Sequence, residues 1–315
     1  MNKNNNKNLP TISIGTSALN EENMIGNFLQ SLLNQEQLSY HLDKIIINSD
    51  GSSDNTTKIA KSFKNKHLLV IDHKIRKGRT NRIMEIFKIN TSDILVIIDT
   101  DMLLGSPRAL ENLVHAFNSK KTLIAGLNVQ PINSKTFVGR LLYTWEKMWL
   151  EIRMRIRNGD TILSLRGGAF AIRNDLVKQI TIPQTIHQIA EYLYHSVKNK
   201  NKSGSFKFIV NALVYYRQPE TLADYISSLS RGDKQDIVTF TNIFGRSILQ
   251  EYIIPRKQKY QGLFKTFLRY PLSLCLTLCF VQFARIVSKN KNNLDKHGFW
   301  PVTYSTKKAF TLKDI

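Results

Sequence analysis

Short apolar runs alternate with longer stretches of helical spacing over the first hundred residues. The apolar runs are short and rich in β-branched residues, which is typical of strands buried on both faces of a parallel sheet. They are Thr11–Thr16, Lys44–Asn48, Leu68–Asp72 and Ile94–Asp99. Helices are predicted between them, over Glu21–Asn34, Asp54–Lys64 and Gly78–Asn90. This alternation predicts an open α/β sheet, in which ligands bind beyond the carboxyl ends of the strands.

The second half of the chain is less regular. Helices are expected over Pro107–Asn118, Val138–Arg157, Thr185–Lys198 and Leu222–Gln250, the last with an interruption near Gly232. Strands are expected over Leu123–Val129, Gly167–Ile172 and Phe206–Tyr215. We predict a tail over residues 1–8, a main domain over 9–250, divided into halves over 9–101 and 102–250, and a C-terminal extension over 251–315. The tail is rich in Asn and Lys, and we interpret it as disordered and as no secretory signal.

The C-terminal extension differs in kind from the rest. Tyr270–Ala284 carries no charged side chain over 15 residues, and basic residues flank it on both sides. A helix that spans a membrane needs roughly 20 apolar residues. The pattern therefore favours a helix that lies in the interface of an anionic membrane. A buried core helix and a short membrane span are the alternatives.

Composition narrows the class of partner. The 315 residues include 42% hydrophobic ones, enough for a large core, and only two cysteines, which excludes a disulfide scaffold and favours a reducing compartment. The net charge of +21 favours an anionic partner, either nucleic acid, an acidic lipid surface or a phosphorylated substrate. Charge alone does not distinguish these three, but no acidic residue occurs between Arg256 and Leu294.

Polar motifs follow three of the predicted strands. The first motif, Thr16 to Glu22, follows the first strand. The second motif, Asp50 to Asp54, has the composition of a turn, in which Ser53 or Asp54 caps the next helix. That role does not require Asp50, whose carboxylate we expect at the crevice, where it can accept a hydrogen bond from a base or a ribose.

The third motif is the pair Asp99 and Asp101. On extended backbone, residues two apart point the same way, so the two carboxylates converge and repel unless a cation lies near them. A hard divalent ion with oxygen ligands, Mn²⁺ or Mg²⁺, would bind there and grip a diphosphate.

Together these motifs resemble the family-two glycosyltransferases, which have the GT-A fold. The family's Pro-Ala-Tyr-Asn-Glu-Glu segment is matched by Ser17–Glu22, its Asp-Gly-Ser-x-Asp turn by Asp50–Asp54, and its Asp-x-Asp by Asp99–Asp101. The order and spacing agree. Ser17 and Leu19 depart from the family's proline and tyrosine. The resemblance implies a Rossmann-like, mostly parallel mixed sheet flanked by helices, followed here by a membrane-associating helical extension.

The resemblance also implies roles for the donor-site residues. Ala18, Leu19 and Glu22 would line the nucleotide pocket, and Asp50 would contact the base. Asp99 would meet the ribose or a metal-bound water, with Thr100 beside it, and Asp101 would bind the metal. Lys77 or Arg79 would contact the base or the diphosphate, or else be a solvated surface cation.

The acceptor half matches the family more loosely. Gly167, Gly168 and Ala169 fit its small-residue acceptor segment, where glycine lets backbone approach a sugar; a strand entry is the alternative. Glu191 is the candidate catalytic base, although Ala190 replaces the acid that usually precedes it, and His187 is the fallback. Arg231 remains from the Gln-x-x-Arg-Trp motif of polymerising relatives and would touch the diphosphate. The missing Gln and Trp argue against processive synthesis.

The sequence thus predicts an inverting, metal-dependent transfer of a sugar from a nucleotide-diphosphate donor, with a UDP-sugar as the expected donor, to an acceptor hydroxyl. We expect it at the cytoplasmic face of a membrane, with a glycan or a lipid-linked acceptor and no nucleic-acid partner. The alternatives are a catalytically silent relative that anchors partners, a sugar nucleotidyltransferase and a basic nucleic-acid-binding protein.

Overall fold

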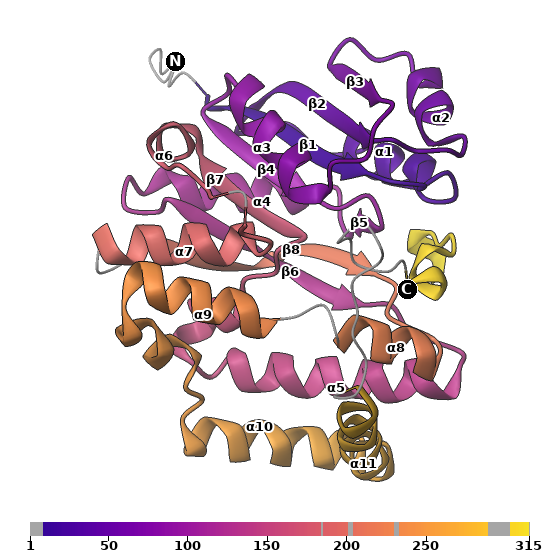
Figure 1. The fold of residues 1–315 in the computed structure, drawn as a ribbon, viewed down its shortest axis with the longest axis vertical. Helices are drawn as coiled ribbons and strands as arrows, with labels where there is room; N and C mark the ends of the chain where they lie inside the picture. The colour runs from indigo at the N-terminus through magenta and orange to yellow at the C-terminus, as the bar shows by residue number, and fades with distance from the viewer. Residues whose placement is uncertain (1–8, 184, 201–203, 230–232, 289–302, 315) are drawn as a thin grey trace, which may run out of the picture.

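The four apolar runs of the first hundred residues form the parallel half of a mixed eight-stranded sheet (Figure 1). The computed structural model describes residues 9–183, 185–200, 204–229, 233–288 and 303–314. The strands lie in the order β3-β2-β1-β4-β7-β6-β8-β5. They are β1 (Thr11–Ala18), β2 (His41–Asp50), β3 (Leu68–His73), β4 (Ile94–Ile98), β5 (Met102–Leu104), β6 (Ile124–Pro131), β7 (Ala169–Arg173) and β8 (Phe206–Tyr216). β3, β2, β1 and β4 pair in parallel, as do β6 and β8, whereas β7 runs antiparallel to β4 and β6.

Helices cover both faces of the sheet, and alternate residues of one strand reach different cores. Along β4, Val96 and Ile98 pack into one hydrophobic cluster, and Leu95 and Ile97 pack into another. The first cluster includes residues of α1 (Ile25–Leu33) and α4 (Ala109–His115), and the second includes residues of α3 (Arg79–Ile89), α6 (Asn174–Gln179) and α7 (Ile189–Lys200). A strand buried on both faces explains why every residue of β4 is apolar. The predicted α/β fold class is confirmed.

The elements of the second half differ from the predictions in their bounds. The predicted helix over Leu222–Gln250 contains α8 (Leu222–Leu229), α9 (Asp233–Phe244) and the start of a 3₁₀ segment (Arg246–Tyr252), and the interruption predicted near Gly232 falls outside the described residues. The uncharged stretch Tyr270–Ala284 lies, from Pro271 on, in one helix, α11 (Pro271–Ser288). A separate helix, α10 (Arg256–Arg269), precedes it, because Pro271 cannot continue the hydrogen-bond ladder of the preceding turn. The three-residue strand β5 had no sequence signal and pairs with the edge of β8.

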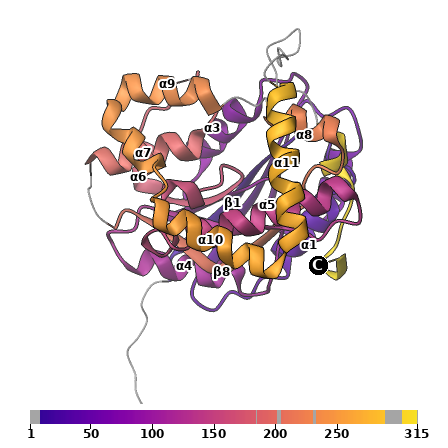
Figure 2. The same ribbon diagram turned by 90° about the horizontal axis from the view of Figure 1, so that it is seen from below.

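α10 and α11 pack beneath α5 (Phe137–Arg153), the long helix that carries Trp145 and Trp149 on one face. In Figure 1, α10 runs across the lower edge of the molecule and α11 is seen nearly end-on, and in Figure 2 both lie in the plane of the picture at its surface. Gly262 lets α10 approach closely, since an added Cβ would come 3.0 Å from the Cα of Ile152. α11 buries only one stripe, Leu274, Thr277, Val281 and Ala284.

The segment after α11 returns to the sheet. Residues 303–314 include a 3₁₀ turn (Tyr304–Lys307), and Phe310 is buried in the same cluster as β1. The Asn27 side-chain amide on α1 donates to the Phe310 carbonyl at 2.9 Å. Lys307 reaches the carboxyl end of β1, where the Leu19 carbonyl accepts from its ammonium at 2.7 Å. Residues 1–8 lie outside the described part of the chain, as does the segment 299–302.

Candidate active site

A cleft of about 620 Å³ opens at the carboxyl ends of β1, β2 and β4. Nine of the predicted site residues line it: Leu19, Asp50, Lys77, Arg79, Asp99, Thr100, Asp101, Gly167 and Gly168. The loop before α7, one residue of α9 and the returning segment 303–307 form the remaining walls. The cleft therefore joins strand ends from the first half of the chain to elements from the second half.

Asp99 and Asp101 follow β4 directly and face this cleft. Burial, followed by the neighbouring Asp99 charge, raises the pKa of Asp101 to about 6. Burial also raises the pKa of Asp99, and the Arg79 guanidinium opposes that shift. Asp101 Oδ1 is buried and accepts no hydrogen bond within the described residues. A buried carboxylate oxygen without a donor is costly, so this atom calls for a cation from outside the chain.

Arg79 holds the first of these carboxylates in place. Its Nε and Nη2 lie 2.9 and 2.7 Å from Asp99 Oδ1, and Nη2 also donates to the Gly167 carbonyl at 2.7 Å. The guanidinium thus ties the end of β4 to the segment before β7. Arg79 is therefore no solvated surface cation.

Gly168 lets the segment before β7 approach Asp99 at the end of β4. An added Cβ would lie 2.6 Å from Asp99 Oδ2 and 2.7 Å from Met102 Cε, and the Asp99 backbone N–H donates to the Gly168 carbonyl at 2.8 Å. Gly168 is thus required by Asp99 itself.

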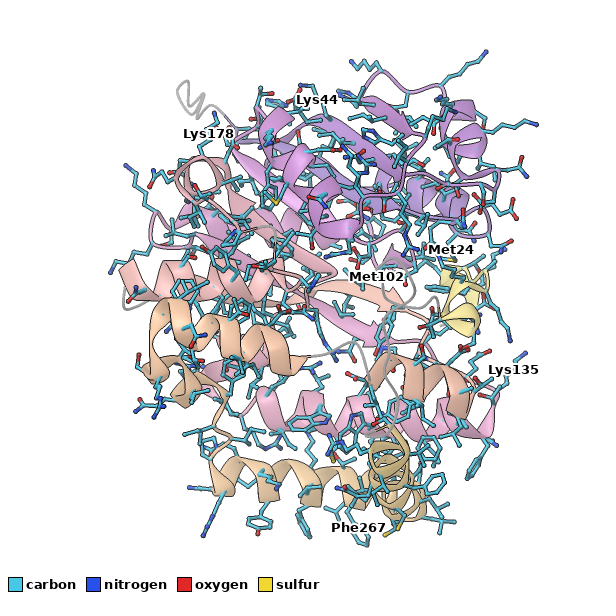
Figure 3. All side chains as sticks on the ribbon, viewed as in Figure 1. Met24, Lys44, Met102, Lys135, Lys178 and Phe267 are labelled. Atoms are coloured by element: carbon cyan, nitrogen blue, oxygen red, sulfur yellow. The ribbon has the colours of Figure 1, made fainter. Side chains whose placement is uncertain are left out.

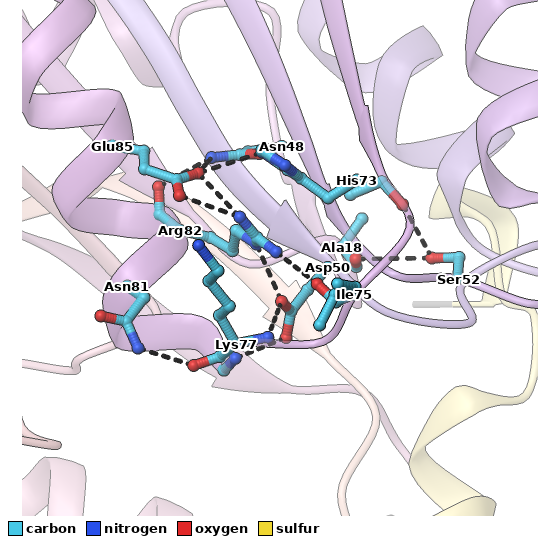
Figure 4. Close-up of polar contacts among 12 residues, drawn as sticks. Ala18, Asn48, Asp50, Ser52, His73, Ile75, Lys77, Asn81, Arg82 and Glu85 are labelled. Atoms are coloured by element: carbon cyan, nitrogen blue, oxygen red, sulfur yellow. Dashed lines mark hydrogen bonds and ion pairs between the residues drawn. The ribbon is translucent and has the colours of Figure 1, made fainter.

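Asp50 is more deeply engaged than the sequence suggested (Figure 4). It is 2% exposed, and its carboxylate accepts from the backbone N–H groups of Lys77 at 2.7 Å and Gly78 at 2.8 Å. Arg82 Nε donates to it as well, at 2.8 Å, from a guanidinium that also binds Glu85 and the Ile75 carbonyl. Asp50 therefore lies at the cleft, as expected, and it also anchors the loop over residues 75–78, which forms one wall of the cleft.

Lys307 brings a positive charge to the same place. Its ammonium donates to the carbonyls of Leu19 and Asn20 and to Glu21 Oε1. Burial raises the pKa of Glu21 to about 7, although the Lys307 charge acts in the opposite direction. The same ammonium opposes the upward shift in the pKa of Asp101. Lys307 therefore compensates part of the negative charge that Glu21 and Asp101 concentrate here.

The residues present fit a divalent ion that is shared with a phosphate ligand. Within the described residues there is no cluster of three or more His, Cys, Asp or Glu side chains suited to a metal. Mg²⁺-type ions are commonly held by one or two carboxylates, with substrate phosphates and water completing the shell. The orphaned oxygen of Asp101 beside Asp99 meets that requirement.

The comparison with known proteins now decides the family. The profile described as Glycosyl transferase family 2 matches residues 13–181, more than half of the chain. The chain belongs to this family of glycosyltransferases. No curated protein sequence matches the chain.

Solved structures share the fold at low sequence identity. A mannosyltransferase, PcManGT from Pyrobaculum calidifontis in complex with GDP-Man and Mn²⁺, gives a TM-score of 0.55 at 13% identity and covers 89% of this chain and 76% of its own. The glucosyl-3-phosphoglycerate synthase from Mycobacterium tuberculosis, in complex with Mn²⁺, UDP-glucose and phosphoglyceric acid, gives 0.53 at 18% identity and covers 75% of this chain and 80% of its own. These likenesses confirm the GT-A fold of the glycosyltransferase.

Three of the predicted binding residues do not line the cleft of the glycosyltransferase. Ala18 is fully buried in the core beneath β1. Glu22 turns toward the loop after β2, where its carboxylate accepts from the backbone and side-chain amides of Asn55 at 3.1 and 3.0 Å. Ala169 points into the core of the sheet, because it is already the first residue of β7. Arg231 lies outside the described residues.

Glu191, the predicted base, also does not line the cleft. Its Oε2 accepts from the hydroxyl of Tyr252 at 3.0 Å, and that hydroxyl lies 2.9 Å from His195 Nε2. Because the tyrosine gives its one proton to Glu191, His195 donates in turn to the tyrosine oxygen. Glu191 therefore belongs to a hydrogen-bonded chain between α7 and the 3₁₀ segment that follows α9, and its place outside the cleft does not support the predicted role as base.

Sequence reasoning missed Arg82 and Asp236 and gave Glu21 and Lys307 no role in the cleft. Glu21 belongs to the matched Asn-Glu-Glu segment, so its neighbour Glu22 was preferred where the structure turns Glu21 inward. Arg82 lies one turn after Arg79 on α3, which a helical reading could have placed on the sheet-facing side. Lys307 and Asp236 come from distant segments, and no local pattern marks them.

Proposed function

We propose that the chain transfers a sugar from a nucleoside diphosphate donor, with a UDP-sugar as the donor, to an acceptor hydroxyl, with inversion at the anomeric carbon. The observation that carries the proposal is the buried, unsatisfied Oδ1 of Asp101 beside Asp99 at the end of an apolar strand. Support for the donor class comes from the two solved relatives, which bind GDP-Man or UDP-glucose together with Mn²⁺.

In this proposal the residues of the cleft divide the work. Asp101 and Asp99 would hold Mn²⁺ or Mg²⁺, which when bound neutralises the leaving diphosphate and orients it. Arg79 keeps Asp99 oriented, and the loop fixed by Asp50 presents Lys77 to the cleft, where its ammonium can meet a phosphate. The acceptor oxygen attacks from the side opposite the diphosphate, so the configuration inverts.

Release of nucleoside diphosphate tests the proposal. UDP-glucose and GDP-mannose are each incubated with the protein and Mn²⁺, with and without a chelator. Asp101→Asn should reduce release at least about 100-fold, because it removes charge stabilisation of the leaving group. The matched control Asp72→Asn removes a carboxylate that pairs with Lys61 at 3.6 Å and with Lys74 at 3.7 Å, away from the cleft, and it should keep the parent rate.

The three possible outcomes have separate meanings. Equal rates for parent and Asp101→Asn refute the metal site. A parent that binds nucleotide and Mn²⁺ but releases none identifies the catalytically silent alternative. A preference for GDP-mannose would change only the proposed donor, from a UDP-sugar to a GDP-sugar.

We propose in addition that α10 and α11 rest on the cytoplasmic face of an anionic membrane. Among the described residues, α11 is the one helix long and apolar enough to span a bilayer, with a mean hydropathy of 1.6, yet only 22% of it is buried, which is unlike a core helix. Large apolar side chains are exposed on both helices: Tyr260, Phe264, Phe267, Leu268, Leu272, Leu276, Phe283 and Ile286. Figure 3 shows Phe267 at the lower edge of the molecule, away from the sheet.

An interfacial position fits the packing of α11 better than a span does. α11 binds the protein along its length, since Thr277 donates to the Leu141 carbonyl at 3.0 Å and Phe280 stacks on Tyr225 at 5.6 Å. A helix crossing the bilayer would have to leave these partners. Exposed basic residues such as Lys259 and Arg269 lie among the apolar ones, the arrangement that binds anionic headgroups. Membrane residence supports a glycan or a lipid-linked molecule as the acceptor.

Vesicle co-sedimentation tests the membrane proposal. The parent should bind phosphatidylglycerol vesicles, and less so at high salt, and should bind phosphatidylcholine vesicles weakly. Replacing Leu268 and Leu272, which are 67% and 73% exposed, with Ser should weaken binding at least tenfold. The control replaces Leu38 and Val238, at 63% and 59% exposed, in the same way. Equal binding by both double variants would refute the assigned face.

A further inference from the structure

The part of the cleft that the second half of the chain forms carries a carboxylate that no motif indicated. Asp236, on α9, lines the cleft together with His187 and Gln188 from the segment before α7. Its side chain is 3% exposed, and its Oδ2 accepts from the Gln188 backbone N–H at 3.2 Å. The His187 backbone N–H is a second donor to the same carboxylate. Both donors precede α7, so Asp236 meets the amino end of that helix.

We propose that Asp236, rather than Glu191, is the general base that deprotonates the acceptor hydroxyl. The assignment rests on the proposed function. It follows from what the other carboxylates of the cleft do. Glu191 is outside the cleft, bound to the Tyr252 hydroxyl.

The remaining described carboxylates of the cleft are committed to cations. Glu21 binds the Lys307 ammonium, and Asp50 binds the Arg82 guanidinium. Asp99 binds Arg79, and Asp101 carries the oxygen that calls for a metal. These four carboxylates lie at the part of the cleft where we propose that the nucleotide binds. Asp236 comes instead from α9, in the second half of the chain, and this is the part of the cleft from which we expect an acceptor to approach the anomeric carbon.

The surroundings of Asp236 suit a base. Burial raises the pKa of its carboxyl, while the backbone N–H groups and the His187 charge oppose the shift. A base gains efficiency as its pKa approaches the working pH. The backbone donors also fix the carboxylate without neutralising it, unlike the arginine and lysine partners of the other acids.

The step balances in atoms and charge. The acceptor oxygen forms a bond to the anomeric carbon, and its proton passes to a carboxylate oxygen of Asp236. The bond between the anomeric carbon and the diphosphate oxygen breaks, and its electron pair leaves with the diphosphate. Asp236 then returns the proton to solvent when product departs.

Two substitutions of Asp236 separate a base from a helix cap. Asn keeps the acceptor oxygen that caps α7 but cannot take a proton, and Asn and Asp cap helices about equally well. Glu keeps the basic carboxylate but lengthens the side chain, which disturbs the cap. As a base, Asp236→Asn should lose about 10²–10⁴-fold in turnover, with Asp236→Glu more active than Asn. A capping role predicts the reverse order.

The measurement is nucleoside diphosphate release from UDP-glucose or GDP-mannose with Mn²⁺, in which water serves as acceptor when no other is supplied. Donor affinity, measured by thermal shift with UDP and Mn²⁺, should stay within about threefold of the parent in both variants. A threefold change in affinity corresponds to less than about 1 kcal/mol. Glu191→Gln is the matched control and should keep turnover within about threefold.

The outcomes distinguish this assignment from the function beneath it. An active parent with equally active Asp236→Asn overturns the base alone, as does a Glu191→Gln variant that loses as much as Asp236→Asn. If only His187→Gln loses turnover, the His187 imidazole is the general base, and the assignment of Asp236 is overturned. A parent that releases no nucleotide from either donor overturns both the base and the proposed transfer.

Discussion

Replacing Arg82 with Met tests whether the buried pair with Asp50 holds the cleft wall in shape. The two side chains are 1% and 3% exposed, and Nε lies 2.8 Å from Asp50 Oδ1. The substitution also removes a donor to the Ile75 carbonyl, at 2.6 Å, and the pairing with Glu85. It would leave Asp50 charged and buried with two backbone donors.

The expected loss is large. Removing one partner of a buried ion pair costs about 3–5 kcal/mol, because the charge left behind is desolvated. For a chain of this size that loss lowers the melting temperature by roughly 6–10 °C. Urea unfolding followed by circular dichroism measures the free energy, and amide hydrogen exchange over residues 75–78 should accelerate in the variant.

Arg108→Met supplies the control. Arg108 Nε lies 2.7 Å from Glu36 Oε2, so the contact is as short, but the side chains are 66% and 40% exposed. Exposed pairs of this kind are worth about 0–1 kcal/mol. If both variants lose the same free energy of unfolding, burial of the Arg82 pair contributes nothing special and the reasoning is refuted.

Two further predictions concern pH and the glycines of the cleft. Burial lowers the pKa of His195 to about 4, below its ordinary value, so the stability this group provides is complete above pH 6.5 and is lost as the pH falls. Between pH 7.5 and 5 the parent should lose about 2 kcal/mol of unfolding free energy that His195→Gln does not lose, and equal losses in urea titrations contradict this. Gly168→Ala should weaken binding of UDP with Mn²⁺ about tenfold by displacing Asp99, as measured by thermal shift. Gly167→Ala, whose Cβ would meet its nearest atom at 3.4 Å, should bind like the parent; equal weakening would disprove the steric account.

The sheet could be predicted from the sequence because its physics is local. The strands β1, β2 and β4 are largely buried, so each appears as a short branched apolar run, as in Ile94–Ile98, whereas β3 at the edge of the sheet is only half-buried. The start of α11 was also predictable, because the uncharged stretch Tyr270–Ala284 begins one residue before it. β5 is three residues long and had no such signal.

The site was predictable where its residues lie next to strand ends. Asp50 ends β2, Asp99 and Asp101 follow β4, and Gly168 precedes β7, and the structure brings all four to one cleft. Asp236 and Lys307 reach that cleft from α9 and from the segment after α11, and their positions depend on how the helices pack. For Glu191 the motif correctly predicted a position near the start of a helix, α7, but the direction of its side chain could not be predicted: it contacts Tyr252.

The path of residues 303–307 has a consequence for how the enzyme becomes competent. The donor cleft takes one wall from the residues just after β1 and another from a segment that is synthesised after α11. A nascent chain that has completed every strand would still lack Thr303, Thr306 and Lys307. A fragment ending at Ser288 should therefore keep the sheet yet bind nucleotide poorly, so maturation of the site waits for the chain to emerge past α10 and α11.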